Sequence, residues 1–121
     1  MAEASRAVQQ RELSSEEYTA ALMARISSLD PQLNSFVACD AEMALASARA
    51  ADAEMASGRP RSPLHGIPVG IKDIIDVKGY ATTCYSKFLL DNRPETDAGV
   101  VESLKSSGGI VAGKTATHEF A

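Results

Sequence analysis

The chain has 121 residues, which is enough for one domain at most or for part of a larger one. Hydrophobic residues make up 45% of the sequence, so a packed core is expected rather than a disordered segment. The formal net charge of −4 disfavours non-specific binding to nucleic acid or to an anionic membrane surface.

The two cysteines, Cys39 and Cys84, follow no disulfide or metal-ligand spacing, and the N-terminus does not resemble a signal peptide. These features predict a reducing, cytoplasmic location. No apolar run approaches the roughly 20 residues that span a bilayer. His65 and His118 are isolated from one another in sequence, so no metal site is expected. No cofactor is expected either.

Residues 1–13 are polar at first and are expected to be frayed or to form a short helix. Ser14 or Ser15 then caps a helix that Pro31 is expected to end, because proline lacks the backbone N–H that a helix interior requires. The predicted apolar stripe of this helix is Tyr18, Leu22, Ile26 and Leu29.

A short strand or an extended turn is expected within residues 33–39. An alanine-rich helix is then expected from Asp40 to about Ser57, and Gly58 ends it. The small residues on one face of this helix allow it to pack closely against a neighbour. That face consists of Ala44, Ala48, Ala51 and Met55.

After a loop with two prolines, residues 67–77 form an apolar run that predicts a strand. A further helix is expected to begin with Thr96 or Asp97 as its cap and to end at Gly108, before a strand at residues 110–112. Helices therefore alternate with buried strands. This order predicts the α/β class, with a mixed, largely parallel sheet flanked by helices.

Residues 108–115 match the phosphate-binding pattern G-x-x-x-x-G-K-[ST]. A P-loop requires a strand, then the glycine loop, then a helix. Here the predicted order is the reverse, because a helix precedes Gly108 and an apolar β-branched run follows it. A nucleotide-binding domain is therefore the weakest hypothesis, and a structural turn between helix and strand is favoured.

The stretch "GIPVGIKDIIDV" carries a lysine inside an apolar run. Alternation predicts that Gly70 and Lys72 share one face of the strand, and Gly70 is expected to leave open space for a backbone or a ligand. A buried lysine is costly to charge, and its neutral amine is a usable base. The alternative is a lysine that extends its amine into water and pairs with Asp73 or Asp76.

The remaining lysines in this half of the chain are expected to be structural, in turns, on a helix surface or at a strand end. They are Lys78, Lys87, Lys105 and Lys114. His65 lies in a loop between two prolines and is expected to make a local hydrogen bond there. Cys84 is expected to be a buried or half-buried thiol rather than a nucleophile.

The segments "PLHGIPVGIKDIIDVKGYATTCYS" and "TDAGVVESLKSSGGIVAGKTATHEFA" resemble the N-terminal part of the amidase signature family. The similarity covers most of the chain from about residue 14 to residue 121, with several motifs in the same order and spacing. The family includes amide hydrolases and the A subunit of glutamyl-tRNA(Gln) amidotransferase. The resemblance implies the amidase-signature fold, of which residues 1–121 would be the N-terminal portion.

The resemblance also implies a Ser–cisSer–Lys mechanism, in which Lys72 matches the catalytic lysine. In the family, both serines and the oxyanion hole come from a Ser/Gly-rich signature that would lie after Ala121. We assign neither the nucleophilic nor the bridging serine to this chain. In particular, Ser86, Ser103, Ser106 and Ser107 do not stand in such a setting.

The expected function is therefore amide hydrolysis, with the 121 residues inactive on their own. The alternative is a non-catalytic fragment or pseudoenzyme of the same fold that acts as an interaction module. The expected partners are a small-molecule amide and either a second copy or other subunits, with no direct contact to nucleic acid or membrane. The sequence leaves open whether the protein is a hydrolase or an amidotransferase component.

Overall fold

The computed structural model describes residues 2–121. The elements in chain order are α1 (Ala2–Gln9), α2 (Ser15–Leu33), β1 (Phe36–Ala38), α3 (Ala41–Ala56), β2 (Pro68–Lys72), the 3-10 turn η1 (Lys87–Leu89), α4 (Gly99–Ser106) and β3 (Ile110–Thr115). The α/β class predicted from the sequence is confirmed, and the N-terminal residues form the short helix that was one of the two alternatives.

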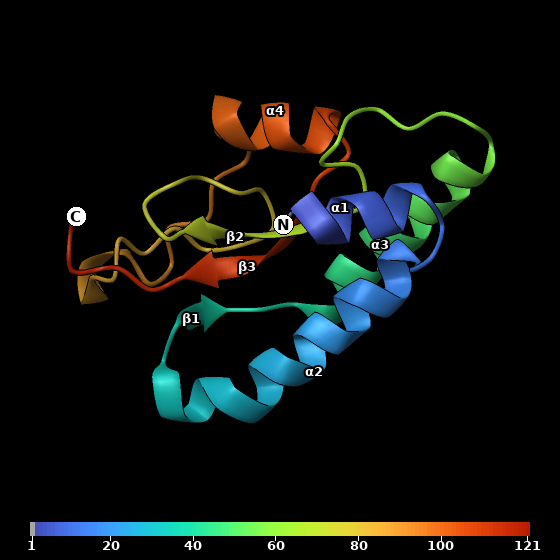
Figure 1. Cartoon of the computed structure of the whole chain (residues 1–121). Helices are drawn as coiled ribbons and strands as arrows, with labels where there is room; N and C mark the ends of the chain where they lie inside the picture. The colour runs from blue at the N-terminus through green and yellow to red at the C-terminus, as the bar shows by residue number, and fades with distance from the viewer. Residues whose placement is uncertain (1) are drawn as a thin grey trace.

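The three strands form one mixed sheet in the order β1-β3-β2. β2 pairs with β3 in parallel, whereas β1 pairs with β3 antiparallel. Figure 1 shows α4 on one side of the sheet, with α2 and α3 on the other. The central strand is therefore β3, and all of its residues except the last are buried.

The core consists of three groups of buried side chains. The α3 side of the sheet buries Met23, Ala44, Ala48, Ile110 and Ala112. The α4 side buries Ile71, Val77, Tyr80, Val101 and Val111. A third group joins α1 to the end of α3 and the start of β2 through Val8, Met55 and Ile67. The predicted alanine face of α3 is confirmed, because all four of its residues are buried.

The N-terminus of α2 follows the sequence prediction, but its C-terminus does not. Ser14 is the N-cap and forms a reciprocal capping box with Glu17. The prediction that Pro31 ends this helix is wrong, because α2 continues through it to a left-handed cap at Asn34. Proline lacks the N–H that would bond within the helix. The Asn34 N–H nevertheless donates to the Asp30 carbonyl at 2.7 Å and closes the last turn.

The buried face of α2 is rotated by about one residue from the predicted stripe. Its buried residues are Ser15, Thr19 and Met23. Leu22 and Ile26 are only partly buried, and Leu29 is exposed. The Ser15 hydroxyl donates to the Gly66 carbonyl at 2.7 Å, so a polar contact with the loop before β2 helps to set the rotation of this helix.

The N-terminus of α4 also differs from the prediction. Its N-cap is Ala98, which makes no side-chain capping bond. Neither Thr96 nor Asp97 serves as the cap. The Asp97 carboxylate instead accepts the Lys78 backbone N–H at 2.8 Å and pairs with the Lys105 ammonium at 2.6 Å. A backbone N–H from the loop after β2 and a lysine of α4 itself therefore bind the carboxylate that was expected to cap this helix.

The glycines of the P-loop-like pattern serve packing and turn geometry. Gly108 follows α4 with φ of +84°, and a Cβ at this position would lie 2.7 Å from the His65 ring. Gly113 lies inside β3 with φ of +154°, where the register with β2 shifts. A Cβ there would lie 2.5 Å from the Ala38 carbonyl oxygen. The helix–turn–strand order predicted from the sequence is confirmed.

Gly113→Ala is expected to destabilise the full-length protein by about 2–4 kcal/mol, since it combines a disfavoured φ with a backbone clash. Gly99→Ala is the matched control, because Gly99 has open space around its Cβ position. It starts α4, where alanine is expected to stabilise by up to about 1 kcal/mol. Urea unfolding followed by circular dichroism measures both changes. Equal effects of the two substitutions would contradict the bulge at Gly113.

Candidate active site

Lys72 is the last residue of β2, at the carboxyl end of the parallel strand pair, where it is in register with Thr115 of β3. Its side chain is exposed, and none of the ion pairs within residues 2–121 includes it. The expectation of a buried lysine is therefore wrong for this part of the structure. β2 is an outer strand of the sheet. At its end Ile71 is buried and Lys72 is exposed.

The open space predicted beside Gly70 is absent. A Cβ at Gly70 would lie 2.8 Å from Thr115 Cγ2 and 3.6 Å from a ring carbon of Phe36. Side chains from β3 and β1 therefore fill the position at which a ligand was expected. The glycine instead allows these two side chains to cover the strand just before Lys72.

The buried lysine of this region is Lys114, for which the sequence predicts only a structural role at a strand end. Its ammonium lies 3.0 Å from the Asp73 carboxylate, and both side chains are fully buried. Lys114 Nζ also donates to the Ala81 carbonyl at 3.0 Å and to Thr82 Oγ1 at 2.9 Å. Three acceptors thus match its three N–H groups. The alternative pairing of Lys72 with Asp73 is also wrong, because Asp73 is bound to Lys114.

Asp73 connects the ends of both parallel strands to the loop that follows. Its carboxylate accepts the Thr83 backbone N–H at 3.2 Å and also the Thr83 hydroxyl. Its own backbone N–H donates to the Thr115 carbonyl at 3.0 Å, and its carbonyl accepts the Cys84 N–H at 2.9 Å. Burial alone would raise the pKa of Asp73, but hydrogen bonds from Thr83 and Lys114 and the charge of Lys114 together lower it.

The loop after Asp73 is held in turn by the last residues of the chain. Cys84 and Tyr85 have positive φ values of 49° and 55°. The buried Ser86 hydroxyl donates to Glu119 at 2.7 Å, and the Phe120 N–H donates to the Cys84 carbonyl at 3.0 Å. Ser86, one of the four serines without an assigned catalytic role, is thus bound to a carboxylate.

Two of the other three serines are also engaged locally. The hydroxyls of Ser106 and Ser107 both donate to the Ser103 carbonyl, at 2.9 and 2.8 Å. These bonds lie within the last turn of α4 and satisfy a carbonyl near the end of the helix. Their setting is that of structural serines in a helix terminus.

The Asp73–Lys114 pair was not expected from the sequence, although a signal for it was present. Lys114 follows the run "IVAG", which is the most continuously apolar strand of the chain. A run of this kind is typical of a central strand, and a lysine within it requires a buried carboxylate partner. The predicted half-buried state of Cys84 is confirmed.

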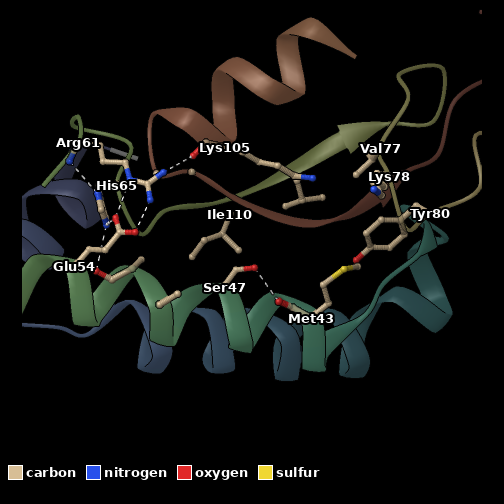
Figure 2. A pocket seen from close by; sticks show the side chains of 15 residues that line it. Met43, Ser47, Glu54, Arg61, His65, Val77, Lys78, Tyr80, Lys105 and Ile110 are labelled. Atoms are coloured by element: carbon tan, nitrogen blue, oxygen red, sulfur yellow. Dashed lines mark hydrogen bonds and ion pairs between the residues drawn. The ribbon is translucent and has the colours of Figure 1, made fainter. Parts of the chain in front are cut away.

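A separate cavity of about 250 Å³ lies between α3, the end of α4 and the loop around Tyr80. In Figure 2, Arg61, His65 and Glu54 lie at one end of it, and Tyr80 and Met43 at the other. His65 is buried and accepts the Arg61 backbone N–H at 2.9 Å, so the predicted local hydrogen bond is confirmed. Lys72 does not line this cavity, which therefore belongs to a different region from the candidate active site.

The described part of the chain shows neither a membrane-spanning helix nor a metal cluster. Within residues 2–121, no helix combines the length and apolar character needed to cross a bilayer. Over the same residues, His, Cys, Asp and Glu side chains form no group of three or more suited to holding a metal ion.

The family model named Amidase matches residues 17–121. The chain therefore belongs to the Amidase family. It is 46% identical over its whole length to the A subunit of glutamyl-tRNA(Gln) amidotransferase from Roseiflexus sp. (strain RS-1). It is also 46% identical over its whole length to the protein of the same name from Pseudomonas putida (strain W619). It covers 25% of each of these two relatives.

Solved structures agree with this assignment. The native peptide amidase from Stenotrophomonas maltophilia superposes with a TM-score of 0.90 at 38% identity, over 96% of this chain and 24% of the amidase. A structure described as a vestigial protein complex that reveals the origins of an s-triazine catabolic enzyme gives a TM-score of 0.93 at 29% identity, over 98% of this chain and 26% of that one. The chain thus spans about a quarter of the length of its relatives.

Proposed function

We propose that this chain forms the part of an amide-hydrolysing enzyme that carries the catalytic base, Lys72. The observation that carries the proposal is the position of Lys72. Its exposed amine stands at the carboxyl end of a parallel strand, while the neighbouring carboxylate of Asp73 is bound to Lys114. Membership of the Amidase family supports amide bonds as the target.

In the proposed mechanism, the neutral amine of Lys72 accepts a proton, through a bridging serine, from a second serine that attacks the amide carbonyl. An acyl-enzyme forms as the C–N bond breaks, and the proton is returned to the departing amine. Water then releases the carboxylic acid by the same route. Both serines follow from the family resemblance and lie outside the 121 residues, so this chain alone is expected to be inactive.

The exposure of Lys72 is consistent with this division of roles. A base that acts on a segment outside these residues has to be accessible to it, and the Lys72 side chain is exposed with no ion-pair partner within residues 2–121. The turn that follows is held by part-buried hydrogen bonds to Asp73 and Lys114, so Lys72 lies at a rigid strand end rather than in a flexible loop.

The substrate and partners extend the same proposal. The curated relatives reported above are named as components of an amidotransferase, which favours glutamine as the first amide to test and partner subunits over a solitary enzyme. A small-molecule amide is the expected ligand of this chain, with no direct contact to nucleic acid. The proposed location remains the cytoplasm.

Hydroxylamine trapping tests the reaction type in the full-length protein. An acyl-enzyme partitions between water and hydroxylamine, so incubation with glutamine or a simple amide should give the hydroxamate as well as the acid. Lys72→Arg should abolish both products, because a guanidinium stays protonated and accepts no proton. Acid release without hydroxamate would rule out the acyl-enzyme. Hydroxamate formation at the normal rate by Lys72→Arg would rule out the role of Lys72.

A further inference from the structure

Lys72 and Asp73 are consecutive residues with opposite environments. The Lys72 side chain is exposed, whereas the Asp73 side chain is fully buried. Lys72 is the last residue of β2, and Asp73 is the first residue of the turn that follows, so the change from an exposed to a buried side chain takes place where the strand ends. The partner that keeps Asp73 buried is Lys114. Lys114 lies on the central strand, β3, in register with Ile71 of β2.

Stability alone does not account for this buried pair. Removing two charges from water costs several kcal/mol per ion, and well-packed apolar residues in their place are often as stable or more so. In return, the pair ties together three segments that are distant in sequence. Lys114 lies on β3, Asp73 follows β2, and the Ala81 carbonyl and Thr82 hydroxyl belong to the next loop. Lys114 thus links these segments to Asp73, the residue directly after Lys72.

We propose that Lys114 is a positioning residue for Lys72: it holds Asp73 on the buried side of the sheet, fixes the strand end from which Lys72 projects, and neutralises the carboxylate next to it in the chain. This inference rests on the proposed role of Lys72 as the base. Lys114 does not touch the substrate in this arrangement. It acts through Asp73.

The electrostatic part of the proposal has a definite sign. Without Lys114, the Asp73 carboxylate would be an unneutralised negative charge on the residue next to Lys72, and it would favour the protonated form of the amine, which cannot act as a base. Other titratable groups also lie on the surrounding segments. They are Asp76, Lys78, Tyr80, Cys84, Tyr85 and Lys87 on the segment after Asp73, and His118 and Glu119 near the end of the chain. Within residues 2–121, none of these donates a hydrogen bond to the Asp73 carboxylate.

The test is the pH dependence of kcat/KM for amide hydrolysis by four forms of the full-length protein: wild type, Lys114→Met, Asp73→Asn and the double variant. In the wild type, kcat/KM should rise with pH on the acidic limb of the profile as the Lys72 amine loses its proton. Lys114→Met should move this limb to higher pH by about one unit, because the negative charge of Asp73 is left without its partner. Asp73→Asn should move it to lower pH, because the positive charge is left alone. The double variant should return the limb to its wild-type position.

A second readout separates positioning from charge. The double variant, which removes both charges, should still lower kcat by about tenfold or more with little change in KM, because Lys72 is no longer held in place. A merely structural pair would change thermal stability and leave the kcat of the folded protein unchanged. An unchanged kcat in the double variant would overturn the inference even if neither single variant folds.

Two further variants complete the design. Lys105→Met removes a lysine whose ammonium pairs with Asp97 in an exposed setting, and it should change neither the limb nor kcat. Lys72→Ala separates the two proposals. If Lys72→Ala remains active, the proposed function itself fails. If Lys72→Ala is inactive while Lys114→Met and the double variant keep the wild-type limb and kcat, only the role of Lys114 is wrong.

Discussion

Replacing Lys72 by alanine in the full-length protein is expected to lower kcat for amide hydrolysis by about 10²–10⁴-fold, which is the usual contribution of a positioned base. The free energy of unfolding should change by no more than about 0.5 kcal/mol, because the side chain is exposed and belongs to none of the ion pairs within residues 2–121. Steady-state kinetics gives the first quantity and urea unfolding the second.

Lys78→Ala is the matched control for this experiment. Lys78 is also exposed and also lies outside the ion pairs of residues 2–121, and its contact with Asp97 is made by the backbone N–H, which alanine retains. It should leave kcat unchanged. A loss of activity in Lys78→Ala equal to that in Lys72→Ala would show that general surface charge is responsible. Normal kcat in Lys72→Ala would exclude Lys72 as the base.

Lys114→Met is expected to produce the largest loss of stability, about 3–5 kcal/mol at pH 7, because it leaves Asp73 charged and buried without its partner. Lys105→Met removes an ion pair of similar length, 2.6 Å, from a partly exposed position. It should cost no more than about 1 kcal/mol. Urea unfolding at pH 7 compares the two. Similar costs would show that burial does not govern the Lys114 pair.

The loss of stability in Lys114→Met should depend on pH, because the pKa of Asp73 is lowered in the folded protein. Such a group contributes stability above its unfolded pKa, about 3.9, and this contribution is lost as the pH falls through the folded value. In Lys114→Met, burial without the partner disfavours the carboxylate, so acid relieves the variant. The stability difference between wild type and Lys114→Met should therefore shrink from pH 7 to pH 3. A constant difference would contradict the ion pair as its cause.

Local sequence patterns were sufficient to predict most of the helices and strands and to indicate the family. The helix α3 follows from an Asp40 cap, four small or flexible apolar residues at helical spacing and Gly58 after its end. The strand β3 and the turn before it follow from two glycines and an apolar β-branched run. These features depend on residues within a few positions of one another, so the sequence carries them directly. The ordered motifs around Lys72 likewise indicated the Amidase family.

The end of α2 and the cap of α4 show where local rules fail. Pro31 was expected to end a helix, yet the Asp30 carbonyl still receives the Asn34 N–H and the last turn closes. Asp97 was one of two expected caps, yet Lys78 and Lys105 bind its carboxylate. In the first case a hydrogen bond within the last turn compensates for the proline. In the second, a backbone N–H from the loop after β2 and a lysine of α4 itself bind the carboxylate that was expected to cap the helix.

Which lysine is buried was decided only by the tertiary structure. Both Lys72 and Lys114 follow apolar runs that predict strands, and neither run indicates the order of the strands in the sheet. Pairing places β3 at the centre and β2 at the side, so Lys114 is enclosed between neighbours while Lys72 remains exposed. Asp73 then pairs across the sheet rather than along the chain. Strand pairing is non-local, and it alone determines which charges must find a buried partner.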